Sequence, residues 1–95
     1  MYIRITTITY DPAQEEALLS LVEEQMIPAF KRQPGFVRYY GGVDRSTQRA
    51  VAVTVWDDME HAAGLRTALG GLIQQLEAIG VRFEPAQLYE VTTQA

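Results

Sequence analysis

The order of patterns along the chain predicts an α+β protein with the ferredoxin-like arrangement β-α-β-β-α-β. Alternating apolar segments at 36–42 and 49–56 are joined by the polar residues 44–48, which is typical of a β-hairpin. Segments with helical periodicity flank this hairpin, and single strand-like segments lie outside them. We therefore expect one domain over residues 1–95, with a four-stranded antiparallel sheet and two helices on one face.

The first strand and the first helix are marked by a change of period at Asp11. Residues 2–10 are β-branched and aromatic, which is typical of a strand. Asp11 can cap a helix, and apolar residues follow it at helical spacing. Pro28 is expected to kink this helix, because it removes a hydrogen-bond donor and crowds the preceding turn. A Pro-Gly pair at 34–35 ends the helix.

The second helix follows the third strand directly. An acidic capping signal at 57–60 starts it, with Asp57 as the cap, and an apolar stripe continues over 65–79. The Gly-Gly pair at 70–71 is expected to break the helix into two pieces. Residues 81–92 form the last predicted strand, in which Pro85 marks a bulge or an edge position.

Both faces of the third strand are uncharged. Its alternate residues form one row of Val51, Val53 and Val55 and a second row of Ala52, Thr54 and Trp56. Because the helices cover only one face, one row would meet water and forgo burial that stabilises by about 25 cal/mol per Å². A homodimer that packs sheet on sheet is the expected remedy.

Composition limits the classes of function. The net charge of −4 argues against nonspecific nucleic-acid binding, which needs an excess of Lys and Arg to contact phosphates. The absence of Cys excludes disulfides and thiolate metal sites. No segment has the pattern of a membrane span or of a secretion signal, so we expect no membrane partner and a cytoplasmic location.

Four short motifs resemble a known family: Ile-Pro-Ala at 27–29, Pro-Gly-Phe at 34–36, Val-Thr-Val-Trp-Asp at 53–57 and His-Ala-Ala at 61–63. The chain resembles, over nearly its whole length, the antibiotic biosynthesis monooxygenase group of the dimeric α+β barrel superfamily. The resemblance implies a homodimer with a pocket between sheet and helices, lined by the tryptophan that ends the third strand. It also implies a small-molecule-binding protein that oxygenates an aromatic or hydrophobic substrate without a cofactor.

Two residues are candidates for catalysis. His61 is the only side chain with an ordinary pKa near neutrality, so it is the candidate base for a phenolic or enolic proton. The alternative is a solvated histidine paired with acidic residues of 57–60. Trp56 is the candidate for packing against a flat substrate and donating its indole N–H. Its alternative role is a core anchor between helix and sheet.

Further residues are candidates for binding the substrate. Arg4 and Arg38 lie in mid-strand between apolar neighbours, and Arg66 on the second predicted helix is a third candidate. They would recognise an acidic or phenolate ligand, or alternatively form interface ion pairs. Tyr39 and the tyrosine that follows it must point to opposite faces, and one of them can contact a ligand. Tyr39 and Thr54 complete the predicted substrate site.

Two other functions remain open from the sequence. The first is a non-enzymatic homodimer that only binds a ligand or serves a structural role. The second is haem binding or degradation. The resemblance disfavours it, because the haem-degrading members of the family use an Asn on the first strand and a His further along the second helix, whereas this chain has no Asn and His61 follows Trp56 by only five residues. No metal site is expected, since one histidine with scattered carboxylates lacks convergent ligands.

Overall fold

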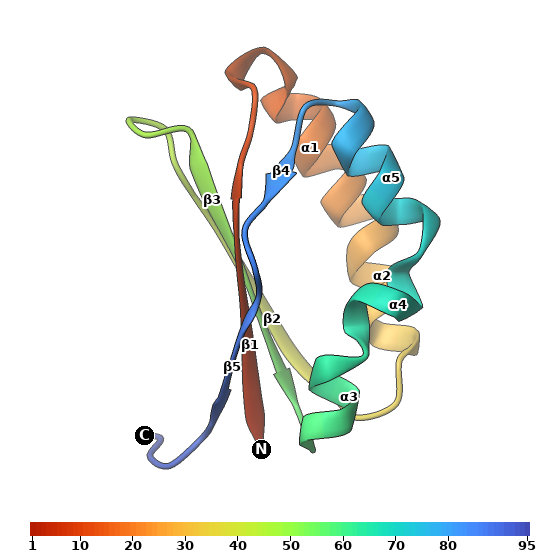
Figure 1. Cartoon of the computed structure of the whole chain (residues 1–95), viewed down its shortest axis with the longest axis vertical. Helices are drawn as coiled ribbons and strands as arrows, with labels where there is room; N and C mark the ends of the chain where they lie inside the picture. Colours follow the sequence, from red (N-terminus) through yellow and green to blue (C-terminus); the bar gives the residue numbers. More distant parts are fainter.

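The computed structural model describes all residues 1–95 and contains one antiparallel sheet whose helices pack on a single face (Figure 1). The strands run in the order β2-β3-β1, and two short strands both pair with the remaining edge of β1. Their bounds are β1 Tyr2–Thr9, β2 Phe36–Asp44, β3 Arg49–Trp56, β4 Arg82–Phe83 and β5 Gln87–Glu90. The predicted α+β ferredoxin-like class is confirmed.

The last strand differs from its prediction. Residues 81–92 do not form one strand but the two short strands β4 and β5, which are separated at 84–86. Pro85 lies in this gap and has no N–H to donate to β1, so the ladder is interrupted there. The break agrees with the irregularity that the proline predicted.

Each predicted helix is built from shorter pieces. The bounds are a 3₁₀ turn Pro12–Gln14, α1 Glu15–Leu21, a π-helical turn Val22–Met26, α2 Ile27–Arg32, α3 Met59–Ala63, α4 Leu65–Leu69 and α5 Gly71–Ala78. The kink expected at Pro28 takes the form of the π-helical turn just before it, because proline cannot donate the helical hydrogen bond. None of the helices is both long enough and apolar enough to cross a membrane.

The second helix also departs from its prediction at one end. Asp58, not Asp57, caps α3, since its side chain accepts the His61 N–H at 2.9 Å. At the Gly-Gly pair the chain breaks as predicted: Gly70 adopts φ +47, a left-handed conformation that separates α4 from α5.

The register decides which row of β3 the helices cover. Arg4 pairs with Thr54 and Ile3 pairs with Val55, so these pairs face opposite sides of the sheet. Thr54 and Trp56 are buried under the helices, with Trp56 fully inaccessible. The valines of the other row lie on the bare face with Ile3 and remain partly exposed.

Candidate functional site

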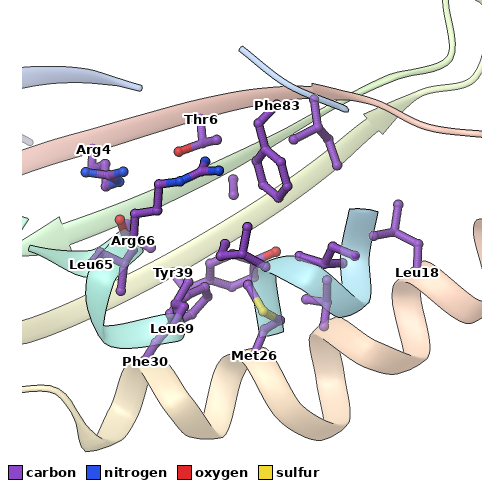
Figure 2. A pocket seen from close by; sticks show the side chains of 16 residues that line it. Arg4, Thr6, Leu18, Met26, Phe30, Tyr39, Leu65, Arg66, Leu69 and Phe83 are labelled. Atoms are coloured by element: carbon purple, nitrogen blue, oxygen red, sulfur yellow. The ribbon is translucent and has the colours of Figure 1, made fainter. Parts of the chain in front are cut away.

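A cavity lies between the sheet and the helices, and twelve of the sixteen residues that line it are hydrophobic (Figure 2). The space open to the centre of a water molecule is about 80 Å³. One water needs roughly 10–15 Å³ by this measure, so the cavity holds several waters or a small ring. A neighbouring cleft of about 310 Å³ shares five lining residues with it: Ile8, Leu18, Val22, Tyr39 and Ala52. A ligand larger than the cavity would extend into this cleft.

The polar groups of the cavity come from four elements. Arg4 and Thr6 lie on β1, Tyr39 on β2, Thr54 on β3 and Arg66 on α4. No carboxylate or imidazole lines the cavity. The site is therefore an apolar space with a few convergent hydrogen-bond donors, which is the usual composition of a small-molecule site.

Arg4 is held in place by the second helix. Its Nη1 donates to the carbonyl oxygens of Ala62 at 3.0 Å and Ala63 at 3.5 Å. Both carbonyls lie at the end of α3, where cations are stabilised by the helix dipole. Burial, and then the neighbouring Arg66, lower the pKa of Arg4 from its ordinary value.

Tyr39 forms the wall between the cavity and the cleft. Its ring packs on Phe30 with centroids 5.3 Å apart, and burial raises the pKa of its hydroxyl. The side chain runs along β2 over Gly41, where an added Cβ would overlap the Tyr39 hydroxyl. Glycine at this position is thus what leaves room for the Tyr39 side chain.

Trp56 lies behind the cavity rather than in its wall. It is fully buried, its Nε1–H donates to Thr54 Oγ1 at 2.8 Å, and its ring meets Phe36 edge to face at 5.6 Å. Thr54 in turn lines the cavity. This placement matches the alternative role as a core anchor, and stacking of Trp56 on a ligand stays a prediction.

His61 lies in a separate surface hollow beside Trp56 and Pro34, and only Leu65 borders both this hollow and the cavity. Its side chain is 34% exposed, and its Nδ1 lies 2.7 Å from Asp57 Oδ1 and 3.3 Å from Asp58 Oδ1. The hydrogen bond to Asp57 raises the pKa of His61 and lowers the pKa of Asp57. A role as general base stays a prediction.

The Asp57–His61 pair rests on the Pro-Gly-Phe turn. Gly35 has φ +80, and its carbonyl accepts the Asp57 N–H at 2.9 Å. A Cβ at Gly35 would overlap Asp57 Oδ1 and His61 Nδ1. The physical reason for glycine in this motif is therefore the close approach of the two chain segments.

Contrary to the expectation of scattered carboxylates, the donor atoms of Asp57, Asp58 and His61 lie within 4.8 Å of one another. The start of a helix brings these positions together, because residues three and four apart share one face. Each group already has a protein partner: Asp58 caps α3, and Asp57 bonds the imidazole.

Arg38 lies outside the cavity. A bulge between Phe36 and Arg38 sets the phase of β2, so that Tyr39 points to the helices while Arg38 and Tyr40 lie on the bare face. There Arg38 Nη1 donates to the Tyr40 hydroxyl at 3.3 Å. The alternation of residues alone could not show this, because the bulge shifts the register.

Sequence reasoning left Thr6 and Phe83 out of the predicted site and named Arg66 only as a candidate for recognising an anion, although all three line the cavity. Arg66 is exposed on α4, and its side chain reaches the cavity, where it lies over the Phe83 ring.

Comparison with known proteins identifies the family. A family model described as "Antibiotic biosynthesis monooxygenase" matches residues 1–67, whereas no curated protein matches the chain. HapK from Hahella chejuensis has a TM-score of 0.82 at 18% identity, covering 100% of this chain and 96% of its own. SnoaB from Streptomyces nogalater, a cofactor-independent oxygenase, has a TM-score of 0.71 at 25% identity, covering 98% and 94%.

A third similar structure comes from Deinococcus radiodurans and is assigned to the antibiotic biosynthesis monooxygenases. Its TM-score is 0.79 at 21% identity, and the match covers 100% of this chain and 96% of that protein. The two chains thus correspond over nearly their whole lengths and share the fold. By the match to the family model, which covers more than half of its residues, this chain belongs to the antibiotic biosynthesis monooxygenase family.

Proposed function

We propose that this protein binds a flat aromatic or hydrophobic molecule in the cavity of Figure 2 and oxygenates it without a cofactor. The observation that carries the proposal is an apolar cavity with a few convergent donors, among them Arg4, Tyr39 and Thr54. Family membership and the likeness to SnoaB, a cofactor-independent oxygenase, support the type of reaction.

The proposed reaction needs no external reductant. A methylene group conjugated with a phenol or a ketone loses a proton, and the carbanion transfers electrons to dioxygen. One oxygen atom enters the substrate as a ketone and the other leaves as water with the two methylene hydrogens. The four electrons that reduce dioxygen come from the oxidised carbon, so the reaction balances.

Arg4 has the main electrostatic role in this proposal. Its guanidinium would lie beside the oxygen on which the negative charge of the carbanion delocalises, and it is already held by the carbonyls of α3. A cation in apolar surroundings also lowers the pKa of a nearby enol or phenol. Tyr39 and Thr54 would orient the ring, while Trp56 holds the Thr54 hydroxyl through its indole N–H.

Two groups are candidates for the base that removes the substrate proton. Since no imidazole or carboxylate lines the cavity, water can take the proton once Arg4 has acidified the substrate. His61 serves instead if the substrate extends past Leu65 into the hollow. Turnover retained by His61→Ala would remove His61 from this role, and a loss with unchanged substrate binding would support it.

We also propose a homodimer formed through the bare sheet face. Ile3, Ile5 and the valines of β3 lie partly exposed on this face, and Tyr40 and Tyr89 are 58% and 50% exposed beside them. A contiguous apolar surface of this kind is unfavourable in water and suits burial against a second copy. The molar mass in solution, measured by light scattering, tests this part.

The activity is tested with anthrone, which carries a methylene group of the required kind. We expect dioxygen uptake above the rate in buffer, one dioxygen consumed per anthraquinone formed, and incorporation of isotopically labelled dioxygen into the product ketone. The metal-stripped, flavin-free protein should be as active as the untreated protein. Uptake no faster than in buffer for anthrone and related phenols would contradict the proposed oxygenation.

A second candidate function is binding without chemistry. The small volume of the cavity and the lack of a base in its wall favour it. In that case calorimetry would detect binding of anthraquinone, whereas anthrone would cause no enzymatic uptake of dioxygen. Haem binding stays disfavoured. If adding haem to the protein causes no shift of the Soret band, this alternative is rejected.

A further inference from the structure

Arg4 and Arg66 line the same cavity, and neither has a carboxylate partner. Figure 2 shows the Arg66 side chain reaching toward Thr6 and Phe83. The ion pairs of the chain lie elsewhere: Glu15 with Arg45, Glu84 with Arg49, and Asp57 and Asp58 with His61. Although acidic residues outnumber Lys and Arg by 12 to 8, these two cations stay unpaired.

Most of the hydrogen-bond donors of the two arginines have no protein acceptor. Arg4 uses Nη1 for the carbonyls that end α3. Arg66 makes no side-chain hydrogen bond and lies over the Phe83 ring, 5.1 Å from its centroid. A guanidinium carries five N–H donors in a fixed fork, so both side chains keep donors free for a ligand. Arg4 is half-buried, whereas Arg66 is exposed, so a ligand can reach Arg66 from solvent.

The surroundings make this pair of charges costly without an anion. Arg4 is partly removed from water and lies near a second positive charge, and both effects disfavour its charged form. Most of the remaining lining is hydrophobic, so the repulsion is screened less than on an open surface. A bound anion between the two guanidinium groups would offset both effects.

We propose that the ligand of this cavity carries a carboxylate, which binds between Arg4 and Arg66. A planar carboxylate matches the fork of a guanidinium and accepts paired hydrogen bonds from it. The flat apolar body of the ligand would then point to the opposite side of the cavity, where Figure 2 shows Met26, Tyr39 and Leu69. This inference rests on the proposed function and narrows its substrate class to aromatic acids.

The test compares two probes of the same shape, 2-naphthoate and the neutral 2-naphthamide, by isothermal titration calorimetry. We expect the carboxylate to bind about tenfold more tightly or better, since hydrogen bonds between two charged groups are stronger than those to a neutral amide. Higher salt should weaken binding of the carboxylate and leave binding of the amide unchanged.

The key variant is Arg66→Gln, because the Arg66 side chain makes no hydrogen bond within the protein and its loss should leave the fold intact. It should reduce the preference for the carboxylate to within about twofold while amide binding persists. The matched control is Arg82→Gln, which removes the same charge from an exposed position on β4 outside the cavity. The control should keep the full preference.

The outcomes separate this inference from the proposed function. Equal binding of the two probes, or an unchanged preference in Arg66→Gln, would overturn the carboxylate site while an aromatic cavity stands. Failure of both probes to bind would overturn the carboxylate site and also remove the support for an aromatic ligand. If Arg66→Gln and Arg82→Gln lost the preference for the carboxylate equally, the preference would come from the net charge of the protein. This result would overturn the site as well.

Discussion

The two faces of one sheet hold chemically similar residues in different environments. On the helix-covered face, Arg4 is half-buried and donates to the carbonyls that end α3. On the bare face, Arg38 is exposed and meets only the Tyr40 hydroxyl. Both arginines lie in mid-strand among apolar neighbours. The chemistry of a strand residue therefore depends on which layer covers its face, and the strand pattern alone does not reveal that layer.

The largest effect should come from the covered face, at Trp56. We expect Trp56→Ala to lower the free energy of unfolding by about 3–5 kcal/mol, because it leaves a large cavity. It also removes the donor that holds the buried Thr54 hydroxyl. Urea denaturation measures the loss. Trp56→Phe keeps the ring packing but not the N–H, so its loss should be smaller. Similar losses for the two variants would contradict an anchoring role for the ring.

On the bare face, Val53→Glu should break the proposed dimer. Burying an unpaired carboxylate costs several kcal/mol, so the dissociation constant should rise about a hundredfold or more. Sedimentation velocity measures the assembly, and circular dichroism checks that the fold persists. Gln74→Glu adds the same charge on the exposed side of α5 and should leave the dimer intact. A dimer that tolerates Val53→Glu would place the interface elsewhere.

Two neighbouring glycines of β2 also differ in which face of the sheet a side chain would meet. A methyl group at Gly41 overlaps the Tyr39 hydroxyl on the cavity side, whereas one at Gly42 meets only Val51 Cγ1 at 3.9 Å. Gly41→Ala should therefore displace Tyr39, destabilise the protein by about 1–3 kcal/mol and weaken aromatic binding about tenfold.

Gly42→Ala is the matched control, and its binding constant should stay within about twofold of the parent protein. Calorimetry with 2-naphthoate measures both variants. If Gly41→Ala and Gly42→Ala bound the probe equally well, Tyr39 would not be part of the wall that the ligand contacts.

The smallest effect should be the pH dependence of the His61–Asp57 pair. The pKa of His61 is raised from 6.5, so its contribution to stability is complete below that value and is lost as pH rises through the folded pKa. The pKa of Asp57 is lowered from 3.8, so its contribution is present above that value and is lost as pH falls through the folded pKa. The pair therefore stabilises the folded protein most between pH 3.8 and pH 6.5.

We expect His61→Gln to lower the urea midpoint more at about pH 5.5 than at about pH 9, since the ion pair is lost as the pH rises through the folded pKa of His61. Both side chains are partly exposed, so the difference should be modest and should shrink in high salt. A midpoint difference that does not change with pH would show that the imidazole acts here through packing alone.

Local sequence patterns were enough to predict the order of the elements, the hairpin, the breaks at Pro28, Gly70 and Pro85, and the family. These features follow from local chemistry: missing N–H groups, left-handed backbone, and alternation of apolar residues. The resemblance to the family rested on short motifs such as Pro-Gly-Phe, whose glycine the structure explains by the close approach of Asp57.

The tertiary structure decided which residues form the site. The bulge in β2 put Tyr39 in the cavity and Arg38 outside it, and the packing of α4 brought Arg66 to the cavity that Arg4 lines. Trp56 turned its N–H to Thr54, and His61 paired with Asp57 in a separate hollow. The reason is physical. Strand register and helix packing depend on contacts between segments that are distant in the sequence, and local sequence patterns do not show which side chains those contacts turn toward the cavity.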